Sequence, residues 1–147
     1  MFSLIISIIA IALVAALAGA SVYYGGSAFN KGTAGADAST LINGGQQING
    51  AWALAKNDGV VTRTNNTTSS DIDSLVSDYL TTMPNFDGVA FDEDDANTDY
   101  VVMAATADIC KEVNEERGGT NEAVSASTTA LFGCDQGATN EFFYKVK

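Results

Sequence analysis

The sequence FSLIISIIAIALVAALAGASVYY, residues 2–24, contains no charged side chain, and Lys31 is the first charged residue of the chain. As a helix with a rise of about 1.5 Å per residue, this segment would be roughly 34 Å long, enough to cross the hydrocarbon core of a bilayer. Its beginning is rich in Leu and Ile, whereas its second half is rich in small residues, which let neighbouring helices approach closely. We therefore expect residues 1–24 to form an apolar helix that lies in a membrane or packs against other helices.

The flanks of this apolar segment do not fit two common kinds of targeting sequence. A cleavable signal peptide begins with a positive charge, and a plain membrane anchor is oriented by basic flanking residues. Nothing positive precedes Phe2. One expectation accounts for both absences: a short charged leader has been removed, and Met1 begins a processed chain.

Glycines follow the apolar segment, and each costs a helix up to about 1 kcal/mol relative to Ala. We expect a flexible section of stalk at Gly25, Gly26, Gly32 and Gly35. A second helical stripe then has spacings of seven, four and three residues. It consists of Leu41, Ile48, Trp52 and Ala55, and Asn57-Asp58-Gly59 is a stop signal. Residues 25–57 are therefore predicted to continue the stalk as a glycine-interrupted helix.

Residues 58–147 are predicted to form a globular head. A polar loop that includes a glycosylation sequon at Asn66 precedes an apolar pattern from Ile72 to Met83, which predicts a helix with Ser70 as its N-cap. A shorter helix around Cys110 should end at Gly118-Gly119.

Strands are expected in the same head at 89–91 and 100–104, separated by an acidic turn at 92–95. A final pair, 130–132 and 141–146, is expected to form edge strands of an antiparallel sheet. The predicted fold class is α+β: a long N-terminal helical stalk, partly transmembrane and glycine-interrupted, with a small head that contains an antiparallel sheet.

Composition argues against several kinds of function. A net charge of −11 does not suit direct nucleic acid binding, which needs clustered Lys and Arg. The chain has no His, no Gly-x-Ser-x-Gly and no Walker A sequence, so we expect no catalytic residue, no enzymatic activity and no cofactor. The run Asp92-Glu93-Asp94-Asp95 could bind Ca²⁺, but it lacks the Gly and the distant Glu of an EF-hand, so a hydrated turn without metal is expected. For Trp52, core packing is expected rather than ligand binding.

The two cysteines, Cys110 and Cys134, admit two interpretations. Beside a membrane segment they suggest one disulfide formed in an oxidising compartment, while a pair of buried thiols is the alternative. A disulfide would stabilise the fold by about 3 kcal/mol in the chain-entropy model.

Three parts of the chain resemble a known family. They are MFSLII at 1–6 before an Ala-rich helix, STLINGGQQI at 39–48, and ADICKEVN at 107–114 with Cys134 after it. In that order they resemble the mature amino terminus, the exposed half of the stalk helix and the disulfide-bounded region of type IV pilins, particularly the type IVb group.

This resemblance implies a structural subunit that polymerises into an extracellular filament through its N-terminal helices, with Cys110 bonded to Cys134. The implied assembly residues are Met1, Phe2, Leu4, Ile5, Ile6, Ile8, Ile9, Leu13, Val14, Leu17 and Gly19. The implied partners are other copies in a helical homopolymer, the pilus assembly machinery of the inner membrane, and the membrane itself before assembly. The implied location is the bacterial cell surface.

One departure from the family concerns a Glu that pilins usually carry shortly after the mature amino terminus. Ile5 or Ile6 stands there in this chain, which suggests either that subunits dock by apolar packing or that the filament is atypical. Three rival interpretations remain: a minor pilin or pseudopilin of a secretion or uptake system, a single-pass membrane or virion protein with an acidic ectodomain, and a calcium-binding module.

Overall fold

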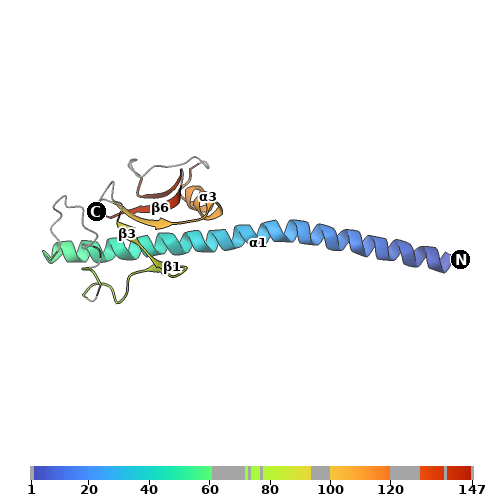
Figure 1. Cartoon of the computed structure of the whole chain (residues 1–147), viewed down its shortest axis with the longest axis horizontal. Coiled ribbons are helices and arrows are strands. Elements are labelled where there is room, and N and C mark those ends of the chain that lie inside the picture. Colours follow the sequence, from blue (N-terminus) through green and yellow to red (C-terminus); the bar gives the residue numbers. More distant parts are fainter. Residues whose placement is uncertain are drawn as a thin grey trace. The chain divides into compact units, whose positions relative to one another are not determined.

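The computed structural model describes residues 2–60, 72, 74–76, 78–93, 100–119, 130–137 and 139–146. Its elements are α1 (Phe2–Asn57), β1 (Asn85–Phe86), β2 (Val89–Ala90), β3 (Asp92–Glu93), β4 (Tyr100–Ala104), α3 (Ala107–Glu116), β5 (Phe132–Gln136) and β6 (Asn140–Lys145). The chain divides into two compact units, residues 1–33 and 34–147. The expected fold class, α+β with a long N-terminal helix and an antiparallel sheet, is confirmed (Figure 1).

Helix α1 is continuous over its 56 residues, so the interruption that we expected at its glycines is not present. A Cβ added at any of these positions, Gly25, Gly26, Gly32 and Gly35, would meet no atom within 4 Å. The helix cost of each glycine is outweighed because propagation of an established helix is cooperative. Bending or melting of this section during assembly stays a prediction.

The end of α1 confirms the predicted stop signal. Gly59 has a φ of +73°, and its N–H donates to Lys56 O at 3.2 Å, while the N–H of Val60 donates to Ala55 O at 3.0 Å. This pair of bonds is a Schellman motif, which satisfies carbonyls that the last helical turn leaves without partners. A left-handed conformation is required at this position, and glycine adopts it without strain.

The larger sheet has the strand order β3-β4-β6-β5, and every pairing in it is antiparallel. Strand β6 therefore lies inside the sheet, and our expectation of an edge strand at 141–146 is wrong, whereas β5 is an edge of the described sheet. The reason is that Phe142, Phe143 and Tyr144 are all buried, which means that both faces of β6 are covered.

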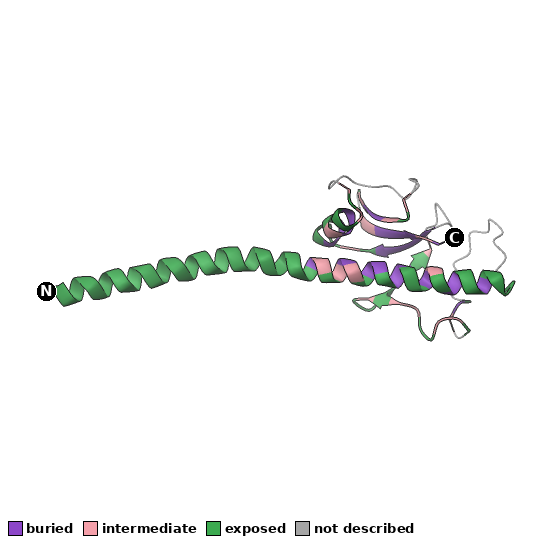
Figure 2. Cartoon of the chain, turned by 180° about the vertical axis from the view of Figure 1, so that it is seen from behind, coloured by how far each residue is buried: buried purple, intermediate pink, exposed green. Residues whose placement is uncertain are grey.

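The main core forms between one face of this sheet and the second half of α1 (Figure 2). Leu41, Ile48, Trp52 and Ala55 are each at most 4% exposed, which confirms the predicted stripe and the core position of Trp52. A smaller cluster on the other sheet face contains Tyr100, Val102 and Phe143.

Two local expectations are corrected. In the segment predicted as a helix from Ile72 to Met83, Ile72 is helical, but the described residues 74–76 and 78–83 form no regular helix. Leu75 O there accepts from both Tyr79 N–H and Leu80 N–H. Its Ser, Thr and Asp residues compete for backbone hydrogen bonds and so disfavour helix, although Ile72 and Leu75 are buried as expected. In addition, Asp92 and Glu93 form strand β3, which pairs with β4, rather than a turn.

Candidate functional site

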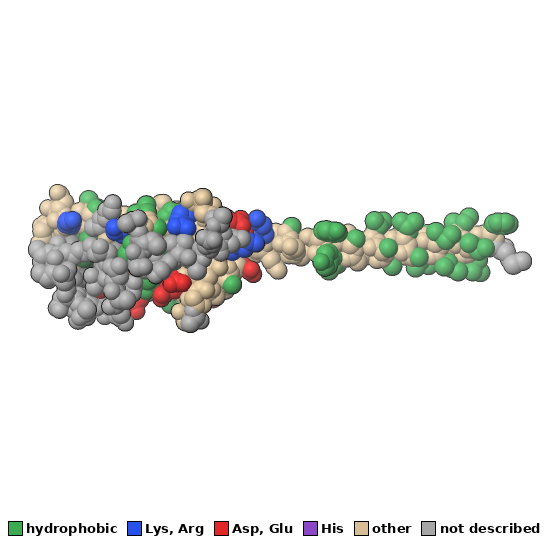
Figure 3. All heavy atoms as spheres, turned by 90° about the horizontal axis from the view of Figure 1, so that it is seen from above, with side chains coloured by type: hydrophobic (Ala, Val, Ile, Leu, Met, Phe, Trp, Pro, Cys, Tyr) green, Lys and Arg blue, Asp and Glu red, His purple; other side chains and the backbone are tan. Residues whose placement is uncertain are grey.

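The predicted assembly residues that the structure describes lie on α1 with their side chains exposed. Exposure ranges from 54% at Ile5 to 85% at Phe2, and Leu4, Ile6, Ile8, Ile9, Leu13, Val14 and Leu17 fall between these values. Because successive helical positions differ by about 100°, exposed side chains such as Leu4, Ile5, Ile6 and Val14 are distributed around the whole helix rather than along a single face. Figure 3 shows hydrophobic side chains along this part of α1. Met1 lies outside the described residues.

Two serine hydroxyl groups within this apolar segment donate hydrogen bonds to backbone carbonyls of the same helix. Ser7 Oγ donates to Ser3 O at 3.0 Å, and Ser21 Oγ donates to Leu17 O at 2.8 Å. Such bonds matter in hydrocarbon, where an unsatisfied polar group costs several kcal/mol. This helix is long and apolar enough to span a membrane. Tyr23 and Tyr24 are about three-quarters exposed, and their rings contact each other edge to face. Tyrosines are enriched at membrane–water interfaces.

Comparison with known proteins identifies no relative of this chain. No protein family, curated protein or solved structure matches the chain. The long apolar helix, the small antiparallel sheet and the disulfide described below are compatible with a pilin-like architecture.

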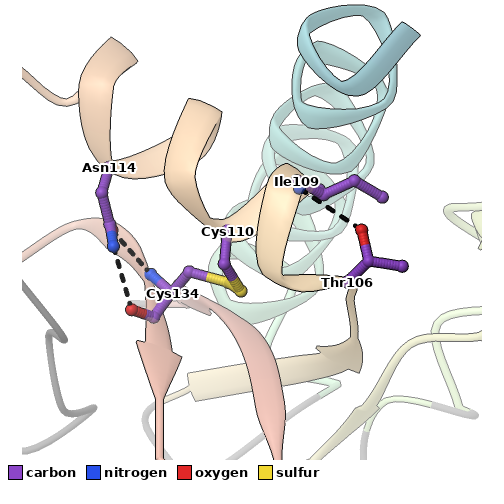
Figure 4. Close-up of a disulfide and its surroundings, with 5 residues drawn as sticks. All are labelled: Thr106, Ile109, Cys110, Asn114 and Cys134. Atoms are coloured by element: carbon purple, nitrogen blue, oxygen red, sulfur yellow. Dashed lines mark hydrogen bonds between the residues drawn. A yellow bond between two sulfur atoms is a disulfide. The ribbon is translucent and has the colours of Figure 1, made fainter. Parts of the chain in front are cut away.

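A disulfide joins Cys110 on α3 to Cys134 on β5, with 5.1 Å between their Cα atoms, so the alternative of two free thiols is excluded (Figure 4). Helix α3 is positioned by Thr106, whose hydroxyl accepts a hydrogen bond from Ile109 N–H at 3.4 Å. The helix ends at Glu116, and Gly118, just beyond the C-cap Arg117, has a φ of +81°. Both sulfur-bearing residues are fully buried.

Asn114 is the buried polar partner of this disulfide. Its Nδ2 donates to Cys134 O at 3.2 Å, and its Oδ1 accepts from Cys134 N–H at 3.1 Å (Figure 4). The side chain thereby satisfies both backbone groups of a β5 residue in the core, where an unpaired group would be costly. We did not predict this role. The available signal was the i, i+4 spacing from Cys110, which places both residues on one face of α3.

Gly44 and Gly45 also have a role that the sequence did not suggest. A Cβ on Gly44 would lie 2.7 Å from Phe91 Cε2, and one on Gly45 would lie 2.5 Å from Tyr144 Cδ2. Glycine ordinarily weakens a helix, but these two let the rings of Phe91 and Tyr144 contact the α1 backbone. Two adjacent glycines within a core-facing stripe were the available signal.

Two tyrosines have altered acidity. Tyr79 OH donates to Asp58 Oδ2 at 2.9 Å, and this hydrogen bond raises the pKa of Tyr79 above its ordinary value. Burial raises the pKa of Tyr144, an effect partly offset by a hydrogen bond with Asn49. Both phenols therefore stay neutral at ordinary pH and serve as hydrogen-bonding groups.

Several candidate sites lie outside the described residues, including Asp94, Asp95, Asn66 and Ser70. Within the described ranges, no group of three or more His, Cys, Asp or Glu side chains is placed to hold a metal ion. The calcium interpretation of the whole acidic run therefore stays untested.

The burial of the disulfide predicts resistance to reduction. Because Cys110 and Cys134 are inaccessible in the folded chain, dithiothreitol should leave the bond intact under native conditions and cleave it after addition of denaturant. Alkylation with a thiol-reactive mass tag, followed by electrophoresis, would measure both states. Replacing both cysteines by alanine should lower the free energy of unfolding by about 3 kcal/mol. Rapid native reduction would contradict the described burial.

Proposed function

We propose that this chain is the structural subunit of an extracellular type IV pilus-like filament, assembled by packing of its apolar N-terminal helices. The observation that carries the proposal is the exposed, uncharged surface of α1 before Lys31, in a chain whose residues 34–147 already have their own core. The residues of α1 that this core buries begin at Ala34.

The energy of this exposed surface explains why it needs a partner. Burying one Leu, Ile or Phe side chain fully contributes about 1.5–3 kcal/mol, and apolar area contributes about 25 cal/mol per Å². Large side chains on all sides of a helix therefore favour an environment without water, in lipid or among copies of the same helix. The proposed sequence of states is a subunit in the inner membrane, extraction by an assembly machinery, and a filament at the bacterial cell surface.

The absence of an acid near the amino terminus fits apolar packing as the main attraction. Ile5 and Ile6 are both more than half exposed in the single chain and would be buried between subunits. The net charge of −11 opposes association, because like-charged surfaces repel one another. Filament formation should therefore strengthen as salt screens this repulsion.

A charge introduced into the apolar helix tests the proposal. We expect Leu13→Lys to abolish filaments, since a Lys at the centre of a helix in hydrocarbon costs about 2.5–3.5 kcal/mol. Leu54→Lys is the matched control, because Leu54 is 60% exposed on α1 but lies within the folded unit of residues 34–147. The measurement is electron microscopy of the full chain after detergent removal, together with sedimentation.

Three outcomes separate the proposal from its rivals. Filaments from the unsubstituted chain and from Leu54→Lys, but none from Leu13→Lys, would support it. Stable insertion into vesicles as single copies, without filaments under any salt condition, would favour the single-pass membrane or virion protein. Dispersed monomers in water without detergent or lipid would rule out both the filament subunit and the single-pass membrane or virion protein. Cellular abundance would then distinguish a major pilin from a minor pilin or pseudopilin.

A further inference from the structure

An uncharged groove lies between α1 and the β1–β2 hairpin, within the folded unit of residues 34–147. Its volume is about 250 Å³. Its polar lining consists of Thr40, Asn43 and Gln47 on α1 and Asn85 on β1, all of them exposed. Phe86 and the buried Phe91 supply its aromatic surface. None of its described lining residues is charged, in a chain of net charge −11.

The lining combines two kinds of recognition. Each side-chain amide of Asn43, Gln47 and Asn85 offers two donors and an acceptor, so it can bond to adjacent hydroxyl groups of one ligand. The Thr40 hydroxyl donates to Ala36 O at 2.9 Å, which leaves its oxygen free to accept. The half-buried ring of Phe86 offers an apolar face against which aliphatic C–H groups can pack.

The spacing and the floor of the groove are set by the helix. Asn43 and Gln47 are four residues apart and lie on one face of α1, with Cβ atoms about 5–6 Å from each other. Between them, Gly44 has no side chain, and a Cβ there would lie 2.7 Å from Phe91 Cε2 and 3.5 Å from Pro84 Cβ. Because Gly44 has no side chain, the Phe91 ring can approach the helix and form the floor of the groove. This close approach keeps the groove shallow between the amides of Asn43 and Gln47.

We propose that this groove binds a neutral saccharide and holds a single sugar ring. Anionic ligands are disfavoured by the negative charge of the chain, and a cation would find no carboxylate in the described lining. A purely apolar ligand would leave the amides without partners. The volume of the groove is below the range of about 300–1,000 Å³ that is typical of sites for drug-sized ligands, which favours a smaller ligand. A stable contact with a second protein would need about 1,000 Å² or more of buried surface, which argues against a protein partner.

Nuclear magnetic resonance of the full ¹⁵N-labelled chain tests this proposal. The chain is held in zwitterionic micelles without sugar headgroups, and the probes are the methyl glycosides of glucose, galactose, mannose and N-acetylglucosamine. At least one glycoside should cause saturable shifts in the side-chain NH₂ signals of Asn43, Gln47 and Asn85. Methyl glucuronide, which is anionic, should bind more weakly than methyl glucoside.

A pair of neighbouring variants supplies the control. Gln47→Ala removes one amide from the groove and should weaken binding about five- to tenfold, whereas Gln46→Ala, also exposed on α1 but outside the lining, should leave it unchanged. No shift with any glycoside, shifts elsewhere, or equal weakening by both variants would overturn the proposal. Shifts of these amides that depend on protein concentration without sugar would overturn it in favour of a contact between copies. None of these results depends on filament formation.

Discussion

Replacing Gly45 by alanine is expected to destabilise the fold of residues 34–147 by about 3 kcal/mol, since overpacking a core typically costs about 1–3 kcal/mol and occasionally more. The added Cβ would lie 2.5 Å from both Cγ and Cδ2 of Tyr144 and 2.7 Å from its Cβ. Contacts this close to the base of a buried ring cannot be relieved by rotation of the ring alone. The helix or strand β6 would have to move.

Gly50→Ala is the matched control for this prediction. Gly50 lies on the same helix, and a Cβ there would meet no atom within 4 Å. Alanine is the better helix former, so this variant should gain about 0.5–1 kcal/mol. Urea unfolding of the full chain in detergent, followed by the fluorescence of the buried Trp52, would compare the two. Equal effects at both positions would contradict the described packing.

The second large effect is expected at Asn114. Asn114→Ala removes both partners of the Cys134 backbone, and each buried group left without a hydrogen bond costs about 1–3 kcal/mol. We therefore expect a loss of about 2–6 kcal/mol in the free energy of unfolding with the disulfide intact. The same urea experiment measures it. Lys111→Ala, at an exposed position of α3, should change stability by less than about 0.5 kcal/mol.

A second variant at this position separates hydrogen bonding from side-chain volume. Asn114→Asp keeps the volume and can accept from Cys134 N–H, but an ionised carboxylate cannot donate to Cys134 O. Compared with the unsubstituted chain at each pH, this variant should be least stable where the carboxyl is ionised. It should recover as the pH falls and the carboxyl gains a proton that it can donate. Equal deficits at all pH values would assign the effect to something other than the lost donor.

Periodicity and charge predicted the elements of this fold better than their arrangement. The charge-free residues 2–24 and the stripe from Leu41 to Ala55 are both found on α1. They were predictable because the hydrophobic periodicity of a short segment indicates both the helix and its buried face. The Cys110–Cys134 bond is also found as expected. These features depend on short segments, or on a pair of residues with a single possible pairing.

Features that depend on packing between distant segments were not predictable from local patterns. Helix propensity alone assigns Gly44 and Gly45 only a cost to the helix, whereas their role comes from Phe91 and Tyr144, which lie far along the chain. Likewise, 141–146 was expected to form an edge strand. Strand position is set by which faces are buried, and β6 has Phe142 and Phe143 on opposite faces.

The position of the Cys110–Cys134 bond has a consequence for damage by proteolysis. Any single peptide bond cut between these two residues would leave both pieces joined through sulfur, as one covalent molecule. Strand β6, which follows Cys134 and pairs with both β4 and β5, would therefore remain tethered next to its partners. A nicked copy would migrate as two fragments in electrophoresis only after a reducing agent had been added.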